Sequence, residues 1–240
     1  MIARGLHTSI KSLGKIVPSN LKGKKKSSQE WLTRQLNDPF VERAKMLNYR
    51  CRSAFKLLEI DQKYGIIKPG SVVIDCGAAP GSWSQIAVKQ SNADGSSANK
   101  PKGMVIGLDL LQIYPIEHAT MMGNMDFTKP ETHNKIRSLL DNRQLDVVLS
   151  DMAPNATGVR SLDQENIMTL CYSVLRFAIL MSSPNASLLM KAWDNAEVST
   201  LEKNIQKYYR MVKRIKPNAS RSDSAEIFVL ARGFAGVEQR

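Results

Sequence analysis

Short runs of hydrophobic residues alternate along this chain with longer amphipathic stretches. The runs typical of buried strands cover residues 71–75, 104–109, 120–125, 145–150 and 186–191. The stretches with helical spacing cover residues 53–64, 83–89, 131–142, 166–181 and 201–209. Strands that alternate with helices in this way predict an α/β fold, with a mainly parallel sheet and helices on both of its faces.

Two further apolar runs, 210–215 and 225–231, follow one another with only a loop between them. This arrangement predicts an antiparallel edge on the otherwise parallel sheet. A polar helical stretch at 31–46, interrupted by Asp38-Pro39, precedes the alternating part. We therefore expect residues 30–240 to form one domain, with ligands bound at the carboxyl ends of its strands.

Residues 1–29 have a different composition, with seven lysines and arginines and no acid. On a helix, Arg4, Lys11 and Lys15 share one face, opposite a row of apolar side chains. This pattern is typical of a mitochondrial transit peptide, and it predicts a location in the mitochondrial matrix. A disordered basic tail, or a nuclear address at residues 22–26, would have a similar composition.

The formal net charge of +12 indicates a polyanionic partner such as nucleic acid, although residues 30–240 carry only +5 of it. The apolar runs fall short of the roughly 18 residues that a membrane-spanning helix needs, so no membrane insertion is expected. Three scattered cysteines without a CxxC pair predict no metal site and fit a reducing compartment.

A glycine-containing loop, Asp75-Cys76-Gly77-Ala78-Ala79-Pro80-Gly81, lies between a predicted strand and a predicted helix. The Gly-Lys-Ser/Thr of a Walker loop does not follow it, and Pro80 removes an amide that a pyrophosphate would use. A ligand with a nucleoside and no phosphate, such as S-adenosylmethionine, suits this loop better. Asp109 could accept hydrogen bonds from ribose hydroxyls, and Asp126 could face the adenine amine.

Four segments resemble the FtsJ-like ribosomal RNA 2′-O-methyltransferases. They are residues 50–59 (R-C-R-S-A-F-K-L-L-E), residues 75–85, residues 150–155 (S-D-M-A-P-N), and residues 216–221 with Glu226 beyond them. The resemblance extends from about residue 31 to residue 231, and the basic leader brings the chain nearest to the mitochondrial member of the family. It implies a Rossmann-like, S-adenosylmethionine-dependent methyltransferase fold.

The resemblance also implies the residues of the active site. The catalytic tetrad would be Lys56, Asp151, Lys191 and Glu226. The cofactor-binding residues would be Gly77, Pro80, Gly81, Ser82, Trp83, Asp109, Asp126 and Asp151. One departure is the turn Ser183-Pro184-Asn185-Ala186, where the family often has Pro-Gly-Gly; asparagine tolerates the left-handed backbone that such a turn uses.

The chemistry agrees with these residue types. A ribose hydroxyl is a poor nucleophile until a base takes its proton, and a lysine is a base only when neutral. Burial and a second cation both lower the pKa of a lysine. We assign hydroxyl activation to Lys191, positioning to Lys56 and Glu226, and a bridge between cofactor and lysine to Asp151. RNA phosphates could be contacted by Arg50, Arg52, Lys213, Arg214, Lys216 and Arg221.

The predicted substrate is a uridine of mitochondrial large-subunit ribosomal RNA, recognised within the subunit by a monomeric enzyme that has a role in subunit assembly. Transfer RNA or an mRNA cap ribose would need the same tetrad, so they stay open as alternatives. A second alternative, from another class, is an assembly factor that binds cofactor and RNA but whose catalysis is dispensable.

Overall fold

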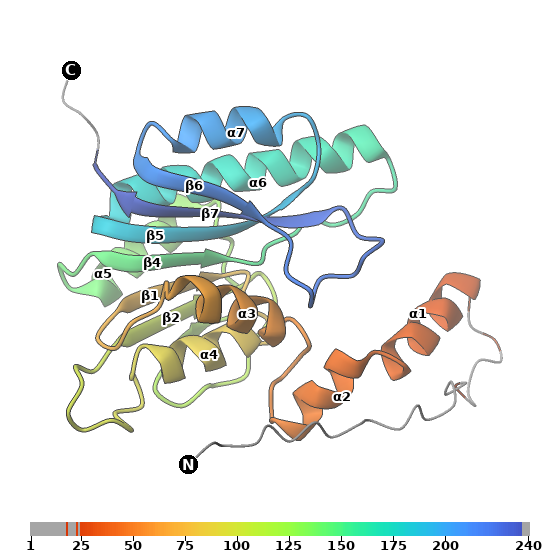
Figure 1. Cartoon of the computed structure of the whole chain (residues 1–240), viewed down its shortest axis with the longest axis horizontal. Helices are drawn as coiled ribbons and strands as arrows, with labels where there is room; N and C mark the ends of the chain where they lie inside the picture. Colours follow the sequence, from red (N-terminus) through yellow and green to blue (C-terminus); the bar gives the residue numbers. More distant parts are fainter. Residues whose placement is uncertain (1–17, 19–22, 24, 237–240) are drawn as a thin grey trace, which may run out of the picture.

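The computed structural model describes residues 18, 23 and 25–236 of the chain (Figure 1). The helical face predicted around Arg4, Lys11 and Lys15 lies outside these residues. The helices are α1 (Lys26–Leu36), α2 (Pro39–Met46), α3 (Ala54–Tyr64), α4 (Ser82–Gln90), α5 (Pro130–Leu140), α6 (Arg160–Met181) and α7 (Val198–Ile205). The strands are β1 (Val72–Cys76), β2 (Met104–Leu108), β3 (Thr120–Met122), β4 (Leu145–Ser150), β5 (Ser182–Trp193), β6 (Tyr209–Ile215) and β7 (Glu226–Phe234).

The strands form one sheet in the order β3-β2-β1-β4-β5-β7-β6. Strands β1 to β5 are parallel, whereas β7 runs antiparallel to both of its neighbours, β5 and β6. The predicted fold class is therefore confirmed, including the antiparallel edge. The insertion of β7 between β5 and β6 places the start of the last strand beside the carboxyl end of β5.

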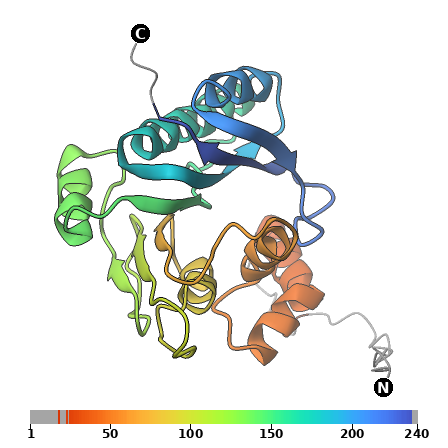
Figure 2. The same cartoon turned by 60° about the vertical axis from the view of Figure 1, so that its left-hand side comes forward.

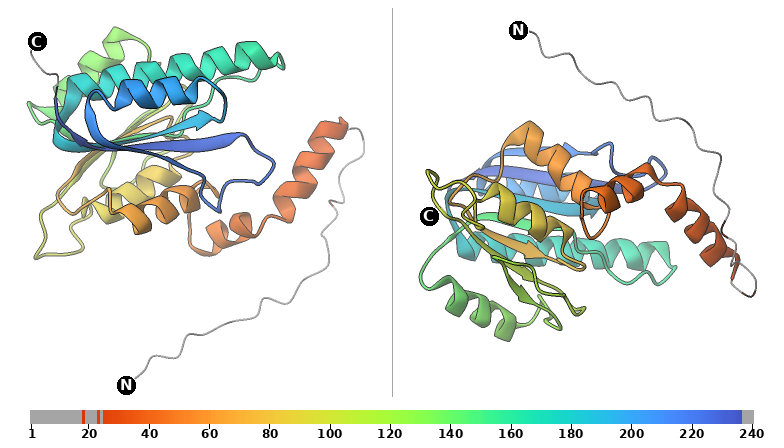
Figure 3. Two further views of the ribbon diagram at one scale, coloured as in Figure 1. Left: turned by 45° about the horizontal axis from the view of Figure 1, so that its top comes forward. Right: turned by 90° about the horizontal axis from the view of Figure 1, so that it is seen from below.

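Helices cover both faces of the sheet, as Figures 2 and 3 show. Alternate residues of each strand point to opposite faces, so Ile106 belongs to the same apolar cluster as Phe177 of α6, whereas Val105 belongs to the cluster of Leu57 in α3 and Ile86 in α4. The layer of α5, α6 and α7 thus belongs to one apolar cluster, and α3 with α4 to the other. This division decides which side chains can reach the carboxyl ends of the strands from each face.

Helices α1 and α2 lie to one side of these layers (Figure 3). Asp38 is the N-cap of α2 and accepts a hydrogen bond from the amide of Phe40, and Pro39 occupies the first turn, where its missing N–H costs nothing. The predicted break at Asp38-Pro39 is confirmed. Helix α1 begins at Lys26, inside the segment assigned to the leader. Across the described residues, no helix is long and apolar enough to cross a membrane.

Among the element boundaries that differ from the predictions, two bear on the candidate site. Strand β5 extends to Trp193, two residues beyond the predicted end, because it pairs with β7 as far as Glu226. Strand β3 ends at Met122, since the chain turns through Gly123 and Asn124, whose backbone is left-handed with φ of 56°. Asp126 consequently lies four residues beyond its strand and not directly after it.

Candidate active site

Two lysine–carboxylate pairs lie at the carboxyl end of the sheet. Lys56 Nζ is 2.7 Å from Glu226 Oε2, and Lys191 Nζ is 2.8 Å from Asp151 Oδ1. The four side chains are only 10–16% exposed, so each charge has lost most of its water and depends on its partner. The structure thus brings all four predicted catalytic residues into ion pairs, although they are far apart in the chain.

The two pairs meet around Phe228 and the first turn of α3. Lys191 is the register partner of Phe228 in the adjacent strand, so their side chains share one face of the sheet. Lys56 Nζ lies 5.8 Å from the centroid of the Phe228 ring on that same face. Ser53, one helical turn before Lys56, donates a 2.5 Å hydrogen bond to Asp151 Oδ2. A continuous chain of contacts therefore links Lys191, Asp151, Ser53 and the Lys56–Glu226 pair.

Each residue of this group is held by regular structure. Asp151 directly follows β4, Glu226 opens β7, and Lys56 projects from α3. Lys191 lies inside β5, not at its end as predicted, and its ammonium also donates to the carbonyl of Asp151. Placement on strands and a helix fixes these side chains more firmly than loops would.

Two serines in this group were missed by the sequence reasoning. Ser53 binds Asp151 and also accepts, through its carbonyl, the indole N–H of Trp83. Ser220 donates a 2.7 Å hydrogen bond to the second oxygen of Glu226. The three-residue spacing of Ser53 and Lys56 was a usable signal, since residues so spaced share a helix face. No comparable pattern in the sequence indicates Ser220.

The glycines of the loop after β1 allow close packing against neighbouring loops. Gly77 has φ of +77°, and a Cβ there would lie 2.5 Å from Met152 Cγ. Gly81 has φ of +117°, and a Cβ there would lie 2.6 Å from Ile116 Cδ1 and 2.9 Å from Arg50 Nη1. At both positions the space that a side chain would fill is occupied by protein atoms, and the contact of Gly77 and Gly81 with a cofactor stays a prediction.

Three other predicted cofactor residues follow in the same loop and in α4. Pro80 is exposed, whereas Ser82 is 3% and Trp83 is 2% exposed. The Ser82 hydroxyl is 3.0 Å from Cys51 Sγ, and the Trp83 ring packs on Phe228 at 5.6 Å between centroids. The Trp83 ring therefore packs against Phe228, the residue around which the lysine pairs lie. Direct contact of the Trp83 side chain with a cofactor stays a prediction.

Asp109 and Asp126 lie near this loop, beyond the ends of β2 and β3. Asp109 accepts hydrogen bonds from the amides of Ala79 and Leu111, at 2.9 and 2.8 Å. Asp126 accepts from the hydroxyl and amide of Thr128, and these bonds lower the pKa of its carboxyl. The amide of Met125, the residue before Asp126, donates a hydrogen bond to the carbonyl of Asp109. The backbone segments that carry the two predicted acids are therefore in contact.

The site is rich in carboxylates at the end of β1. Asp75 is fully buried beneath the loop, and desolvation raises the pKa of its carboxyl to about 7. A hydrogen bond from Ser84 opposes that rise, while the charges of Asp151 and Asp109 add to it. Such clustered negative charge opposes a pyrophosphate and favours a cation. S-adenosylmethionine carries both a sulfonium and an ammonium group, so the residues present fit it.

The basic residues that flank the tetrad in sequence are largely engaged within the protein. Arg52 pairs with Asp38 at 2.8 Å, and Arg214 pairs with Asp194 and Glu202 at 2.8 and 2.9 Å. Arg50 and Lys216 donate hydrogen bonds to backbone carbonyls. Arg221 lies 3.7 Å from Asp38, and the Lys213 ammonium lies over the Tyr64 ring. Their contacts with RNA stay a prediction, with fewer free charges than the sequence suggested.

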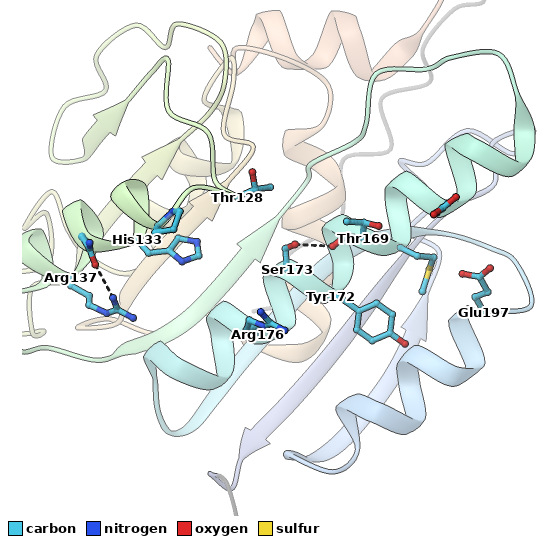
Figure 4. Close-up of a pocket in the computed structure, with 12 residues that line it drawn as sticks. Thr128, His133, Arg137, Thr169, Tyr172, Ser173, Arg176 and Glu197 are labelled. Atoms are coloured by element: carbon cyan, nitrogen blue, oxygen red, sulfur yellow. Dashed lines mark hydrogen bonds between the residues drawn. The ribbon is translucent and has the colours of Figure 1, made fainter.

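A groove of about 710 Å³ lies on the other face of the sheet, among α5, α6 and the start of α7 (Figure 4). Its lining includes His133, Arg137, Tyr172 and Arg176. The His133 ring lies against those of Phe127 and Phe177 and its Nε2 is 2.7 Å from a carbonyl oxygen, which gives it a structural role. Over the part of the chain that the structure describes, no cluster of three or more His, Cys, Asp or Glu could hold a metal.

Comparison with known proteins agrees with this geometry. The profile of the FtsJ-like methyltransferases matches residues 49–234. A Drosophila melanogaster protein named rRNA methyltransferase 2, mitochondrial, is 58% identical over 98% of this chain and 94% of its own length. The ribosomal RNA large subunit methyltransferase E of Cereibacter sphaeroides is 43% identical over 90% of this chain and 87% of its own. A Plasmodium falciparum crystal structure described as a ribosomal RNA methyltransferase shares the fold, with a TM-score of 0.69 and 24% identity, and covers 78% of this chain and 100% of its own.

Proposed function

Because the chain belongs to the FtsJ-like methyltransferase family, we propose that it transfers a methyl group from S-adenosylmethionine to a ribose 2′-hydroxyl of RNA. The observation that carries this proposal is the two partly buried lysine–carboxylate pairs around Phe228, at the carboxyl end of the sheet. The cofactor supplies an electrophilic methyl on a positively charged sulfur, and the residues of the chain supply alignment and proton removal.

In this proposal Lys191 first loses one ammonium proton to solvent, and the lone pair of the resulting neutral amine then accepts the proton of the ribose hydroxyl. Its ammonium is held by both the carboxylate and the carbonyl of Asp151, so its direction is fixed before substrate arrives. Lys56 and Glu226 position the nucleotide, and Ser220 and Ser53 fix the acids. General-base catalysis of this kind contributes about 10²- to 10⁴-fold to a rate, so alignment must supply much of the remainder.

The same proposal assigns the cofactor to the loops at the ends of β1, β2 and β3. Asp109 and Asp126 would accept hydrogen bonds from the nucleoside, and Asp151 would face the sulfonium. The other assigned positions are Gly77, Pro80, Gly81, Ser82 and Trp83. The support is electrostatic, because a cluster of carboxylates stabilises a ligand with two positive groups.

For the substrate, we propose a uridine of mitochondrial large-subunit ribosomal RNA, methylated by a monomer in the matrix during subunit assembly. The names of the two relatives support this choice, one through the mitochondrion and the other through the large subunit. Residues 1–29 would be the transit peptide and residues 30–240 the methyltransferase domain. An already structured ribosomal particle would contribute to recognition of the RNA substrate.

The test is methyl transfer by purified protein to large subunits from mitochondria that lack it. We expect Lys191→Ala to lower kcat at least about 100-fold, with the product mapped as a 2′-O-methyl group. Lys135→Ala is the matched control, because Lys135 is an exposed lysine of α5 on the other face of the sheet. Activity of Lys191→Ala within threefold of the parent, or methylation of a base, would overturn the proposal.

A further inference from the structure

Arg50 lies between the two loops that border the proposed cofactor site. We propose that it is a positioning residue that joins the loop 77–81 to the loop 109–119, and that cofactor affinity depends on this link. The inference rests on the proposed function for the identity of the ligand. The sequence instead suggests that Arg50 contacts RNA phosphates, and the two assignments predict different defects.

The guanidinium of Arg50 makes three hydrogen bonds, all to backbone carbonyls. Nη1 donates to the carbonyls of Pro80 and Tyr114, both at 2.8 Å, and Nη2 donates to that of Pro115 at 2.6 Å. Pro80 belongs to the first loop, and the other two residues belong to the second. A planar group with donors in fixed directions can join two loops in this way, which a lysine ammonium on a flexible stem cannot reproduce.

The backbone of Arg50 is itself held by α4. The Gln85 side chain accepts a hydrogen bond from the Arg50 amide at 3.0 Å, and it donates to the carbonyl of Asn48 at 2.9 Å. Helix α4 begins directly after the loop 77–81, so the arginine is anchored to the element that this loop starts. The guanidinium is therefore aimed before any ligand binds.

Gly81 provides a second observation for the link. Because a Cβ at this position would lie 2.9 Å from Arg50 Nη1 and 2.6 Å from Ile116 Cδ1, the absence of a side chain lets both loops approach the guanidinium. Asp109 joins the same two loops at another point, since it accepts the amides of Ala79 and Leu111. Arg50 and Asp109 thus form two separate cross-links between the loops.

The loop 109–119 needs these cross-links because part of it packs poorly. Leu110, Leu111 and Tyr114 are 65%, 66% and 75% exposed, so few apolar contacts hold this stretch. Segments with little buried surface open at low free-energy cost. Loss of the Arg50 bonds should therefore release the loop and lower the population that can bind the cofactor, without a change in the tetrad.

The experiment compares the full chain with Arg50→Ala and Arg50→Lys, with Arg137→Ala as the control because Arg137 is an exposed arginine of α5. The Kd of S-adenosylhomocysteine is measured by calorimetry without RNA. We expect Arg50→Ala to raise this Kd about tenfold or more, and Arg50→Lys to give a Kd between those of the parent and Arg50→Ala. The KM for the cofactor should rise in parallel, while kcat at saturating cofactor stays within about twofold.

Hydrogen exchange of the unliganded protein separates this inference from the proposed function. We expect faster exchange at residues 109–119 in Arg50→Ala and unchanged exchange in the β4 and β5 core. An unchanged exchange rate in that loop would overturn the link, as would a Kd within twofold of the parent. If the parent binds no cofactor at all, the proposed function fails, and the exchange result still decides whether Arg50 joins the loops. A defect confined to the KM for RNA would assign Arg50 to the substrate and overturn the inference.

Discussion

At the scale of single residues, Asp75 is the carboxylate whose burial has the clearest consequence for stability. It is fully buried in β1, and one oxygen accepts a 2.7 Å hydrogen bond from Ser84. The other oxygen, Oδ1, has no partner among the described residues. An ionised carboxylate with one unpaired oxygen is costly to bury, which is why the pKa of this group rises to about 7.

The raised pKa fixes the sign of a pH dependence. The folded state binds the Asp75 proton more tightly than the unfolded state, whose carboxyl has the ordinary value of 3.8. The stability from this group is therefore fully present below about pH 4 and is lost as pH rises through about 7. We predict that Asp75→Asn, which cannot ionise, gains up to a few kcal/mol relative to the parent between pH 5 and pH 8.5.

Urea unfolding of both proteins across that pH range checks the prediction. The asparagine amide would lack a partner at the Oδ1 position, so a constant offset at all pH values is also expected. The relevant quantity is therefore how the difference in unfolding free energy between Asp75→Asn and the parent changes with pH. Asp223→Asn is the control, because Asp223 is exposed. The prediction is contradicted if the profiles of Asp75→Asn and the parent are parallel, or if Asp223→Asn diverges from the parent equally.

At the scale of elements, Asp38 attaches α2 to the rest of the protein. Its Oδ1 caps α2, while its Oδ2 lies 2.8 Å from Arg52 and 3.7 Å from Arg221. Arg52 in turn donates to the carbonyl of Ala219, the residue before Ser220 of the active site. The carboxylate is only 10% exposed, so removal of its charge leaves a shielded guanidinium without an anion.

The two functions of Asp38 can be separated by substitution. We predict that Asp38→Asn, which can still cap the helix, destabilises the protein by about 1–2 kcal/mol through the lost ion pairs. Asp38→Ala should lose the cap as well and cost about 1 kcal/mol more. Urea denaturation measures both free energies. Equal destabilisation by the two variants would show that the cap contributes nothing to α2.

Comparison of elements shows which part of the fold periodicity could predict. Strand β4 was predicted with correct ends, because it lies between two parallel strands and four of its six residues are apolar and buried. Helix α6 begins at Arg160, six residues before the predicted start, because its first turn is polar and has no apolar stripe. The signal there was chemical: Asp163 accepts hydrogen bonds from the amide and hydroxyl of Thr157.

In the active site, too, some residues could be predicted from the sequence and others could not. The four charged residues could be predicted because motifs carry them and because Lys191 and Glu226 adjoin apolar strand runs. The contacts of Ser220 and Arg50 could not be predicted. The contact of Ser220 depends on the insertion of β7 between β5 and β6, and those of Arg50 join positions up to 65 residues apart in the chain. Hydrophobic periodicity carries no information about strand order or about such long-range contacts.

At the scale of the whole molecule, the sheet separates two surfaces with different chemistry. The lysine pairs lie around Phe228, whose apolar cluster includes α3 and α4, whereas the groove with Arg137 and Arg176 lies among α5 and α6 (Figure 4). Residues 1–29 hold more than half of the net charge of the chain. The charge of the leader and the charge of the folded domain therefore need separate tests.

The last prediction concerns the leader, residues 1–29, and its role in mitochondrial import. If residues 1–29 are a transit peptide, their fusion to a fluorescent protein should carry it into the matrix, because the membrane potential draws basic amphipathic segments inward. Arg4→Gln, Lys11→Gln and Lys15→Gln together should abolish import, since they remove the charge from one face and leave the apolar face intact. Protease protection in mitoplasts measures the outcome. Residues 25–240 alone keep the whole of α1 and should stay outside, so their import would contradict the assignment of the address to the leader.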